Sequence, residues 1–228
     1  MPGRGSDNAL PRAVSLLTPP GNLAVALGRA LAGAGHSLLV TGRVPGHGSA
    51  AVAMIGGGAE SVEPADCAGR TDIVVLAIAW PGLVPALSLV GARDGRLAGA
   101  TLMDCTHAVD YGTGRLLPER GSAAELVADT PRGAHVVKAL HLLAGTGWPY
   151  VGPAERAPVV AVCGDDAGPL ARSTSLIGDL GARAIVIGGL DAARQAEQAA
   201  GFAMRVVSAG ANPRDAVPDV DPGTLRRA

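Results

Sequence analysis

A short loop near the N-terminus carries the residues best suited to bind a phosphate. Pro19, Gly21 and Ala24 have the spacing of the three glycines of a dinucleotide-binding loop. Gly21 keeps the middle position, where the backbone must approach a pyrophosphate, whereas the prolines at 19 and 20 fix φ and remove two N–H donors. Anion binding then falls to N–H groups at the start of the following helix, namely those of Gly21, Asn22 and Leu23. We predict nucleotide binding by an altered loop; the alternative is an α/β crossover without a ligand.

A basic residue follows the next apolar run. Residues 41–43 are Thr41, Gly42 and Arg43, and no carboxylate occurs until Glu60. An NAD enzyme usually has an acidic residue here to bind the ribose 2′-OH, whereas an arginine can pair with a 2′-phosphate and stack on adenine. Thr41 adds a hydroxyl group. The sequence therefore favours NADP(H) over NAD, and the alternative is an ordinary surface arginine.

Strands and helices must alternate around these residues to bring them together. Apolar runs of strand length are found at 13–17, 37–41, 73–78, 100–103, 135–138, 158–163 and 184–187. Helices are expected at 25–35, 50–55, 63–67, 83–90, 122–128, 166–180 and 190–207. This alternation predicts an α/β fold with a Rossmann-like, doubly wound, mostly parallel sheet. We expect a single domain over residues 13–207, a flexible N-terminal arm at 1–12 and a polar C-terminal tail at 208–228.

Composition excludes several classes of protein. The net charge of −1 argues against a nucleic-acid-binding surface, and no apolar run is long enough to span a membrane. The three cysteines have neither paired nor metal-like spacing, which indicates a reduced, cytoplasmic protein. Of the five aromatic residues, four fall in expected loops after strands, namely Trp80, Tyr111, Trp148 and Tyr150. Flat rings at that edge of a sheet suit a planar small-molecule ligand; the alternative is packing at the rim.

Several segments outside the phosphate loop resemble one enzyme family, the NADPH-dependent coenzyme F420 reductases, also called F420-dependent NADP oxidoreductases. The similar segments are residues 34–36 with 41–43, 76–80, 104–107, 136–141 and 163–166, followed by 188–190 and Arg194. The last three are the most specific, because a generic Rossmann fold does not require them. The resemblance covers residues 13 to about 201. Residues 19 and 20, and Cys105 and His107, depart from the family pattern.

The resemblance implies direct hydride transfer between the nicotinamide ring of NADP(H) and the deazaflavin ring of F420, without an acid or base from the protein. It places NADP(H) on the 21–23 turn, on 41–43, and on the strand end with Ala77, Ala79 and Trp80. It places the second ring near Ala139, Leu140, His141, Gly189 and Leu190. We add His107 and Trp148 as substrate-binding candidates. The resemblance also favours a homodimer paired through the last helix.

The remaining polar residues each have two interpretations. His141 could bind a substrate oxygen or donate a proton, which makes it the catalytic candidate; the alternative is packing. Cys105 and His107 could form a nucleophilic pair, but Cys105 is better explained as a small buried apolar residue. Lys138, the one lysine of the chain, suits phosphate binding or packing. Asp165 and Asp166 favour capping of a helix over a metal site.

Two other functions stay open because the phosphate loop is altered. The crevice could belong to a tailoring enzyme, such as a cyclase or isomerase, that has lost the redox use of NADP and employs His141, His107 or Tyr111 as acid–base groups. The chain could instead be a non-catalytic nucleotide-binding protein. The identity of the hydride acceptor is not encoded in any motif; F420 or another planar conjugated molecule fits.

Overall fold

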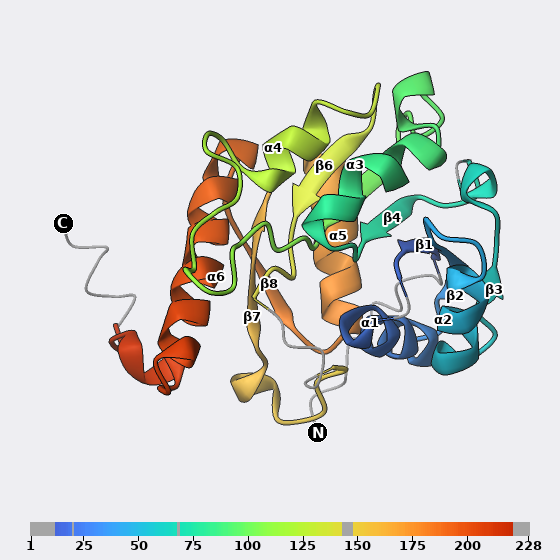
Figure 1. Ribbon diagram of the computed structural model, residues 1–228. Helices are drawn as coiled ribbons and strands as arrows, with labels where there is room; N and C mark the ends of the chain where they lie inside the picture. Colours follow the sequence, from blue (N-terminus) through green and yellow to red (C-terminus); the bar gives the residue numbers. More distant parts are fainter. Residues whose placement is uncertain (1–11, 20, 68, 143–147, 221–228) are drawn as a thin grey trace.

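The computed structural model describes residues 12–19, 21–67, 69–142 and 148–220 (Figure 1). In these residues eight strands form one sheet in the order β3-β2-β1-β4-β5-β6-β7-β8. The strands are β1 Ala13–Leu17, β2 Ser37–Thr41, β3 Glu60–Ser61, β4 Ile73–Leu76, β5 Thr101–Asp104, β6 His135–Lys138, β7 Val159–Cys163 and β8 Arg183–Gly188. All neighbouring strands are parallel except β6 and β7. The predicted Rossmann-like, mostly parallel α/β fold is confirmed.

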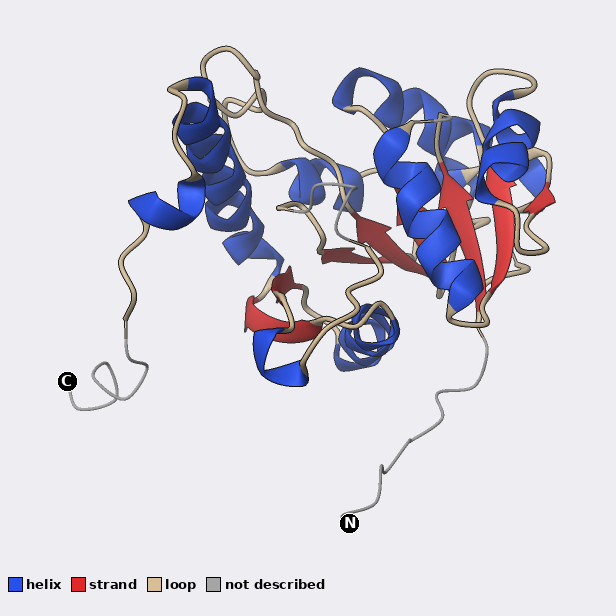
Figure 2. Cartoon of the chain, turned by 90° about the horizontal axis from the view of Figure 1, so that it is seen from below, coloured by secondary structure: helices blue, strands red, loops and turns tan. Residues whose placement is uncertain are grey.

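Helices cover both faces of this sheet (Figure 2). They are α1 Asn22–Gly33, α2 His47–Ile55, α3 Trp80–Leu89, α4 Ala123–Ala128, α5 Ala167–Asp179 and α6 Ala193–Ser208. Helices α1, α2 and α5 contribute to one buried apolar cluster, and α3, α4 and α6 to a second cluster. Short 3-10 turns are η1 Pro64–Asp66, η2 Ala92–Asp94, η4 Ala154–Arg156, η5 Leu190–Ala192 and η6 Pro213–Ala216.

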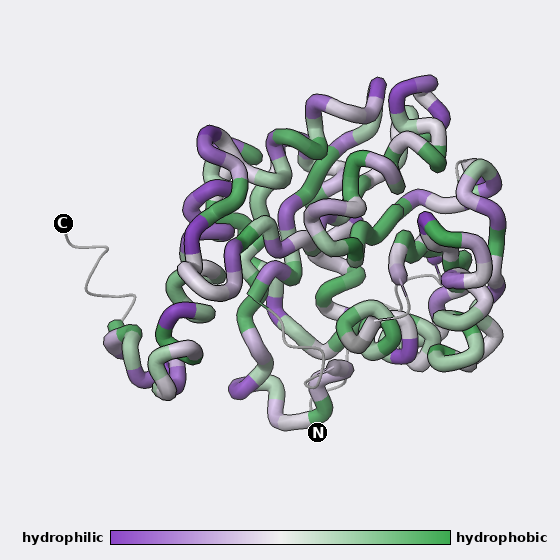
Figure 3. The backbone as a smooth tube through the Cα atoms, in the orientation of Figure 1, coloured by the Kyte–Doolittle hydropathy of each residue, from purple (hydrophilic) through white to green (hydrophobic). Residues whose placement is uncertain are grey.

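The apolar runs become strands because both of their faces are covered. All four residues of β4 are buried, and its alternate side chains enter the two clusters: Ile73 and Val75 one, Val74 and Leu76 the other. Figure 3 shows apolar segments gathered in the interior and hydrophilic residues mainly at outer turns. Burial of this kind supplies the main driving force of folding.

The chain reverses its direction of winding at β1. From β1 it runs through α1 to β2 on one side, and it later returns to β4 on the other side. Leu17, at the carboxyl end of β1, pairs in register with both Thr41 of β2 and Leu76 of β4. Three strands therefore end level with one another, and the switch point where nucleotides bind in such sheets lies at their carboxyl ends.

Several element boundaries differ from the sequence prediction. Helix α3 begins at Trp80 rather than residue 83, because Pro81 is compatible with the first helical turn. Helix α2 begins at His47 rather than residue 50, after Gly46 adopts a positive φ of 82°. The expected 63–67 helix is only the short turn η1, and the two-residue strand β3 was not predicted. The expected polar tail carries the turn η6, capped by Asn212.

No helix in the described residues is long and apolar enough to cross a membrane. On α6, Phe202 and Val207 are 50% and 53% exposed, but residues five apart do not share one helix face, so these two side chains alone do not mark a surface for the expected pairing of two chains. That pairing stays a prediction. The proposed flexible arm falls almost wholly on residues 1–11, which lie outside the described residues, as do residues 221–228 of the tail.

Candidate functional site

A crevice of two adjoining cavities lies at the switch point, along the carboxyl ends of β1, β2, β4 and β5. The larger cavity, of about 530 Å³, extends toward β5, and the smaller, of about 230 Å³, extends toward β2. Both are lined by the residues that directly follow β1 and β4, namely Thr18, Pro19, Ile78, Ala79 and Pro81. The Ala77 N–H donates a hydrogen bond to the Leu17 carbonyl (3.1 Å), which links these two strand ends.

The altered phosphate loop keeps an open approach to the backbone. Gly21 lines the larger cavity, and a Cβ added there would have no neighbour closer than the Pro19 carbonyl oxygen, at 3.9 Å. The space above Gly21 is therefore free for a ligand atom. The Gly21 N–H, however, donates to that same carbonyl (2.7 Å), so it already has an acceptor in this structure, and the expectation that it binds an anion stays a prediction.

The first turn of α1 offers further N–H groups at the crevice. The first helical hydrogen bond runs from the Val25 N–H to the Gly21 carbonyl (3.0 Å), which leaves the N–H groups of Leu23 and Ala24 without a helical acceptor. Both residues line the larger cavity. The side chain of Asn22, another predicted cofactor contact, lies outside the described residues. The loop thus fits a pyrophosphate through the helix N-terminus.

Gly42 has a structural role that the sequence interpretation did not separate from binding. A Cβ at this position would lie 2.7 Å from the Cβ of His47 and 2.8 Å from the Thr18 carbonyl oxygen. The close approach of β1, β2 and the start of α2 therefore requires glycine here. Gly21 and Gly42 differ in what they leave room for: a ligand at Gly21 and the protein's own chain at Gly42.

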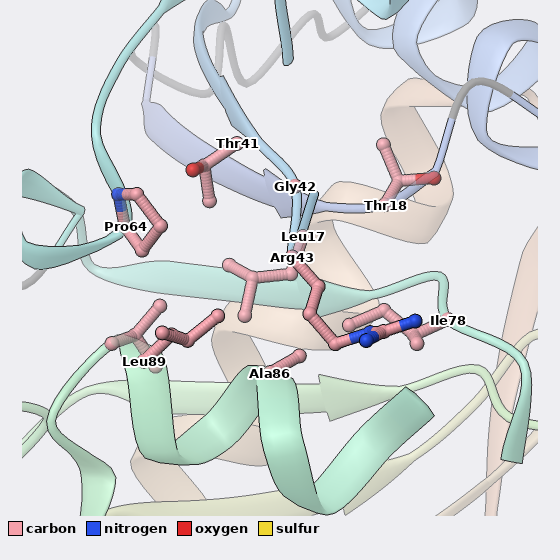
Figure 4. A pocket seen from close by; sticks show the side chains of 10 residues that line it. Leu17, Thr18, Thr41, Gly42, Arg43, Pro64, Ile78, Ala86 and Leu89 are labelled. Carbon is pink, nitrogen blue, oxygen red and sulfur yellow. The ribbon is translucent and has the colours of Figure 1, made fainter. Parts of the chain in front are cut away.

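Arg43 and His47 line the smaller cavity together. Figure 4 shows the guanidinium of Arg43 reaching from the end of β2 across toward Ile78. Arg43 is exposed and makes no ion pair within the described residues, so its charge is available to a ligand. Thr41 is only 2% exposed and lies in the small hollow beside Arg43. Sequence reasoning missed His47, because the helix that carries it was expected to begin only at residue 50.

At its far end the larger cavity is lined by His107, Cys105 and Tyr111, and by apolar Val109 and Leu117. The Nε2 atom of His107 is buried and has no hydrogen-bond partner in the described residues. Burial, together with the Lys138 ammonium, lowers the pKa of His107, so the imidazole is neutral at pH 7. Burial raises the pKa of the Cys105 thiol, which supports a small buried apolar role rather than a nucleophile.

A buried group of charges lies behind this end of the crevice. The Lys138 ammonium contacts Asp104 Oδ2 (3.0 Å), Glu197 Oε1 (3.0 Å) and the carbonyl of Thr106 (2.8 Å). Glu197 also accepts hydrogen bonds from the N–H groups of Ala123 (2.9 Å) and Ala124 (3.2 Å), at the start of α4. Lys138 therefore has a packing role, one of the two expected. The group joins β5 and β6 to α4 and α6.

The second set of predicted residues does not meet at the crevice. His141 lines a separate cavity of about 20 Å³ with Leu140 and Val160, and neither ring nitrogen has a partner in the described residues. Burial and the nearby Lys138 lower the pKa of His141 to about 4. Leu140 holds a left-handed φ of 58°, a strained value for a residue other than glycine.

The other candidates of that set lie in the protein interior or away from the cavity. Ala139 is fully buried, and Trp148 packs against the apolar cluster to which α1, α2 and α5 contribute. Leu190 is buried in the other cluster, and its N–H donates to Asp165 Oδ1 (2.8 Å). Gly189 lies beside it at the start of η5. Of the predicted substrate-binding residues, His107 lines the crevice. The predicted cofactor-binding residues that line it are Gly21, Leu23, Arg43, Ala77, Ala79 and Trp80.

Comparison with protein families supports the resemblance drawn from the sequence. Residues 19–108 match the family model described as NADP oxidoreductase coenzyme F420-dependent. The resemblance is thus confirmed over the segment that contains the phosphate loop, Arg43 and the ends of β4 and β5. Residues 109–228 lie outside the match. No curated protein matches the chain.

Solved structures share the fold. A hypothetical protein from Sinorhizobium meliloti has a TM-score of 0.66 at 22% identity, over 81% of this chain and 88% of that one. A reductive aminase from Aspergillus terreus, in complex with NADPH and ethyl levulinate, has a TM-score of 0.62 at 16% identity over 88% of this chain and 63% of its own. An imine reductase from Bacillus cereus has a TM-score of 0.61 at 16% identity over 87% of this chain and 61% of its own. This chain spans less than two thirds of the length of those two reductases, and at such identities the likeness establishes the fold alone.

Proposed function

We propose that this protein is an NADPH-dependent oxidoreductase that passes a hydride between NADP(H) and coenzyme F420 or another planar conjugated acceptor. The observation that supports this most is the placement of Gly21 and Arg43 along one crevice at the β1–β4 switch point. An open backbone approach for a pyrophosphate and an uncommitted guanidinium for a 2′-phosphate are the two features that NADP(H) requires. The family match over residues 19–108 adds to this support.

Each end of the crevice has its own part in this proposal. The first-turn N–H groups of α1 would bind the pyrophosphate. Arg43, with His47 and the N-terminus of α2, would bind the 2′-phosphate. Ala77, Ala79 and Trp80 would line the nicotinamide end, where the larger cavity opens toward His107. The charged and uncharged ends would fix the direction in which the cofactor lies.

The bound cofactor would supply or accept the hydride. The protein's contribution is then to hold two rings against each other and to keep water out. Leu23, Val109 and Leu117 are apolar side chains lining the larger cavity and serve the second purpose. Direct transfer between rings needs no proton from the chain, so neither His107 nor His141 is required as an acid.

Replacing Arg43 tests the proposal. In Arg43→Ala we expect the Kd for NADPH to rise about tenfold to a hundredfold, since a charge-assisted contact of about 1.5–3 kcal/mol is lost. The Kd for NADH should rise much less, because NADH has no 2′-phosphate and loses only the stacking of Arg43 on adenine. Arg93→Ala is the matched control, since Arg93 is also exposed but lies beyond the far end of α3. An equal loss for NADPH and NADH would contradict the 2′-phosphate assignment.

A second function has one observation in its favour. Because Pro19 and Pro20 have no N–H and the Gly21 N–H is already bonded to the Pro19 carbonyl, the loop offers fewer donors than a loop with three glycines. His107 and Tyr111 line the same cavity and could serve as acid–base groups of a cyclase or isomerase. This alternative gains if the wild-type protein binds neither NADPH nor NADH at millimolar concentration.

A further inference from the structure

Two of the five aromatic residues of the chain line the larger cavity. They are Trp80, at the start of α3, and Tyr111, which lies in the loop between β5 and α4. Trp80 is half-buried, whereas Tyr111 is 58% exposed. The ring of Tyr111 therefore presents a flat apolar surface at the cavity that the protein itself leaves largely uncovered, and a planar ligand can cover it.

Tyr111 belongs to a hairpin that runs from Val109 to Leu116, two residues joined by an antiparallel bridge. Asp110, the residue before Tyr111, is held inside the hairpin. Its Oδ1 accepts hydrogen bonds from the N–H (2.7 Å) and the hydroxyl (2.9 Å) of Thr113. Bonds on both sides of Tyr111 thus fix the backbone that carries the ring.

Helix α6 sets the position of this hairpin, which lies alongside it (Figure 1). A Cβ added to Gly114 would lie 2.7 Å from the carbonyl oxygen of Gly201, and a Cβ added to Gly201 would overlap the carbonyl oxygen of Gly114. Arg205, one turn further along α6, donates a hydrogen bond to the carbonyl of Gly112 (3.1 Å). The hairpin can approach the helix this closely only because both contact positions are glycines.

We propose that the planar ring of the acceptor stacks on Tyr111, and that α6 holds Tyr111 in place through the contact of Gly114 with Gly201. The inference rests on the proposed function, because it assigns the acceptor side of the same crevice. An aromatic ring on a backbone that is already fixed loses little freedom when a ligand arrives, so its stacking adds to affinity at a small ordering cost. The contact moves no proton, which agrees with direct hydride transfer between two rings.

Binding of F420 and of riboflavin, two planar conjugated ring systems, to the full chain saturated with NADP⁺ tests the stacking contact. Tyr111→Ala should weaken binding of the tighter of the two ligands about tenfold, whereas Tyr111→Phe, which keeps the ring, should stay within about twofold of the wild type. Phe202→Ala is the matched control, because Phe202 is a 50% exposed aromatic residue of α6 that is not among the described residues lining the crevice. It should leave ring binding unchanged. NADPH is titrated separately, and its Kd should change by less than about twofold in all three variants.

Gly201→Ala tests the part played by α6. The added methyl group would displace the hairpin, so ring binding should weaken about fivefold. In the double variant with Tyr111→Ala, the loss should equal that of Tyr111→Ala alone, because both substitutions act through the same ring. Arg205→Met removes the bond to Gly112 without adding bulk at the contact and should weaken ring binding about twofold. It replaces Gly201→Ala in the same comparison if that variant does not fold.

Unchanged ring binding in Tyr111→Ala, additive losses in the double variant, or no binding of either ring system overturns the inference. A protein that binds NADPH but fails these tests retains the NADP(H) site of the proposed function. A protein that does not bind NADPH loses both the proposed function and the inference.

Discussion

Charged side chains at the carboxyl edge of the sheet lie in two opposite environments. At the end of β2, the guanidinium of Arg43 lies at the surface of a cavity and is free to meet a ligand. At the ends of β5 and β6, Asp104 and Lys138 are fully buried and, with Glu197, satisfy one another. A charged residue after a strand can therefore serve binding in one half of the molecule and hold helices together in the other. What distinguishes the two roles is whether the charge is buried and ion-paired, and not the type of residue.

Breaking the buried group should have the largest effect. In Lys138→Met, two carboxylates would stay buried without their cation, and we expect a loss of about 3–5 kcal/mol in the free energy of unfolding. Chemical denaturation followed by circular dichroism measures this loss. In Arg70→Met, which breaks the exposed pair with Glu60 (3.4 Å), the loss should be under about 0.5 kcal/mol. Equal effects of the two substitutions would contradict the distinction between buried and exposed charge.

His141, which is buried just after β6, should make the stability of the protein depend on pH. The pKa of His141 is lowered to about 4 in the folded protein, against 6.5 when unperturbed. Above pH 6.5 both states are neutral; below it the unfolded chain binds the proton first, so stability falls as the pH drops from 6.5 toward 4. We expect a loss of about 3 kcal/mol over this range from His141.

His141→Leu provides the matched comparison for this pH dependence. The variant removes two ring nitrogens that have no partner in the described residues, so it should fold at pH 7 and show a flatter profile below pH 6.5. Denaturation curves of both proteins at several pH values give the difference directly. Identical slopes would show that His141 takes up a proton without cost and is not held neutral by burial.

Substitutions of Gly21 and Gly42 should have different effects on stability and on NADPH binding. Gly42→Ala should lose about 1–3 kcal/mol, because its Cβ would meet Thr18 and His47 at under 3.0 Å. Gly21→Ala should change stability by less than about 0.5 kcal/mol, since its nearest neighbour is at 3.9 Å. It should nevertheless weaken NADPH binding about tenfold, because the methyl group would occupy the approach to the pyrophosphate. Thermal melts and NADPH titrations of both variants check this, and a destabilised Gly21→Ala protein with unchanged affinity would contradict it.

The region at the ends of β1 and β2 was largely predictable from local sequence patterns. The apolar runs fixed β1 and β2, and the residues that follow a parallel strand necessarily come to the carboxyl edge of the sheet. Gly21 and Arg43 therefore fall at the crevice as expected. The hydrogen bond from the Gly21 N–H to the Pro19 carbonyl was not predictable, because the spacing of glycines does not show which acceptor a glycine N–H binds.

The region at the ends of β5 and β6 depends on contacts between distant segments. Glu197 lies on the same helix face as Ala193, Ala196 and Ala200, all buried, so the spacing of small residues was a signal that its carboxylate enters the core. Its partner, Lys138, is 59 residues away in the sequence, and no local pattern joins them. His141 follows a strand end just as His107 follows β5, yet only His107 lines the crevice. Gly189 does not line the crevice either, although Gly188 pairs with Cys163, and Cys163 pairs with Lys138 at the carboxyl end of β6.

The most direct test of the central claim is a titration of the wild-type protein with NADPH and, separately, NADH. Nicotinamide fluorescence and quenching of Trp80, which lines the larger cavity, would be followed together. We predict micromolar binding of NADPH and binding of NADH weaker by about tenfold or more, because only NADPH offers a 2′-phosphate to Arg43. No binding of either nucleotide at millimolar concentration would contradict the account and show that the Pro19 turn has closed the site.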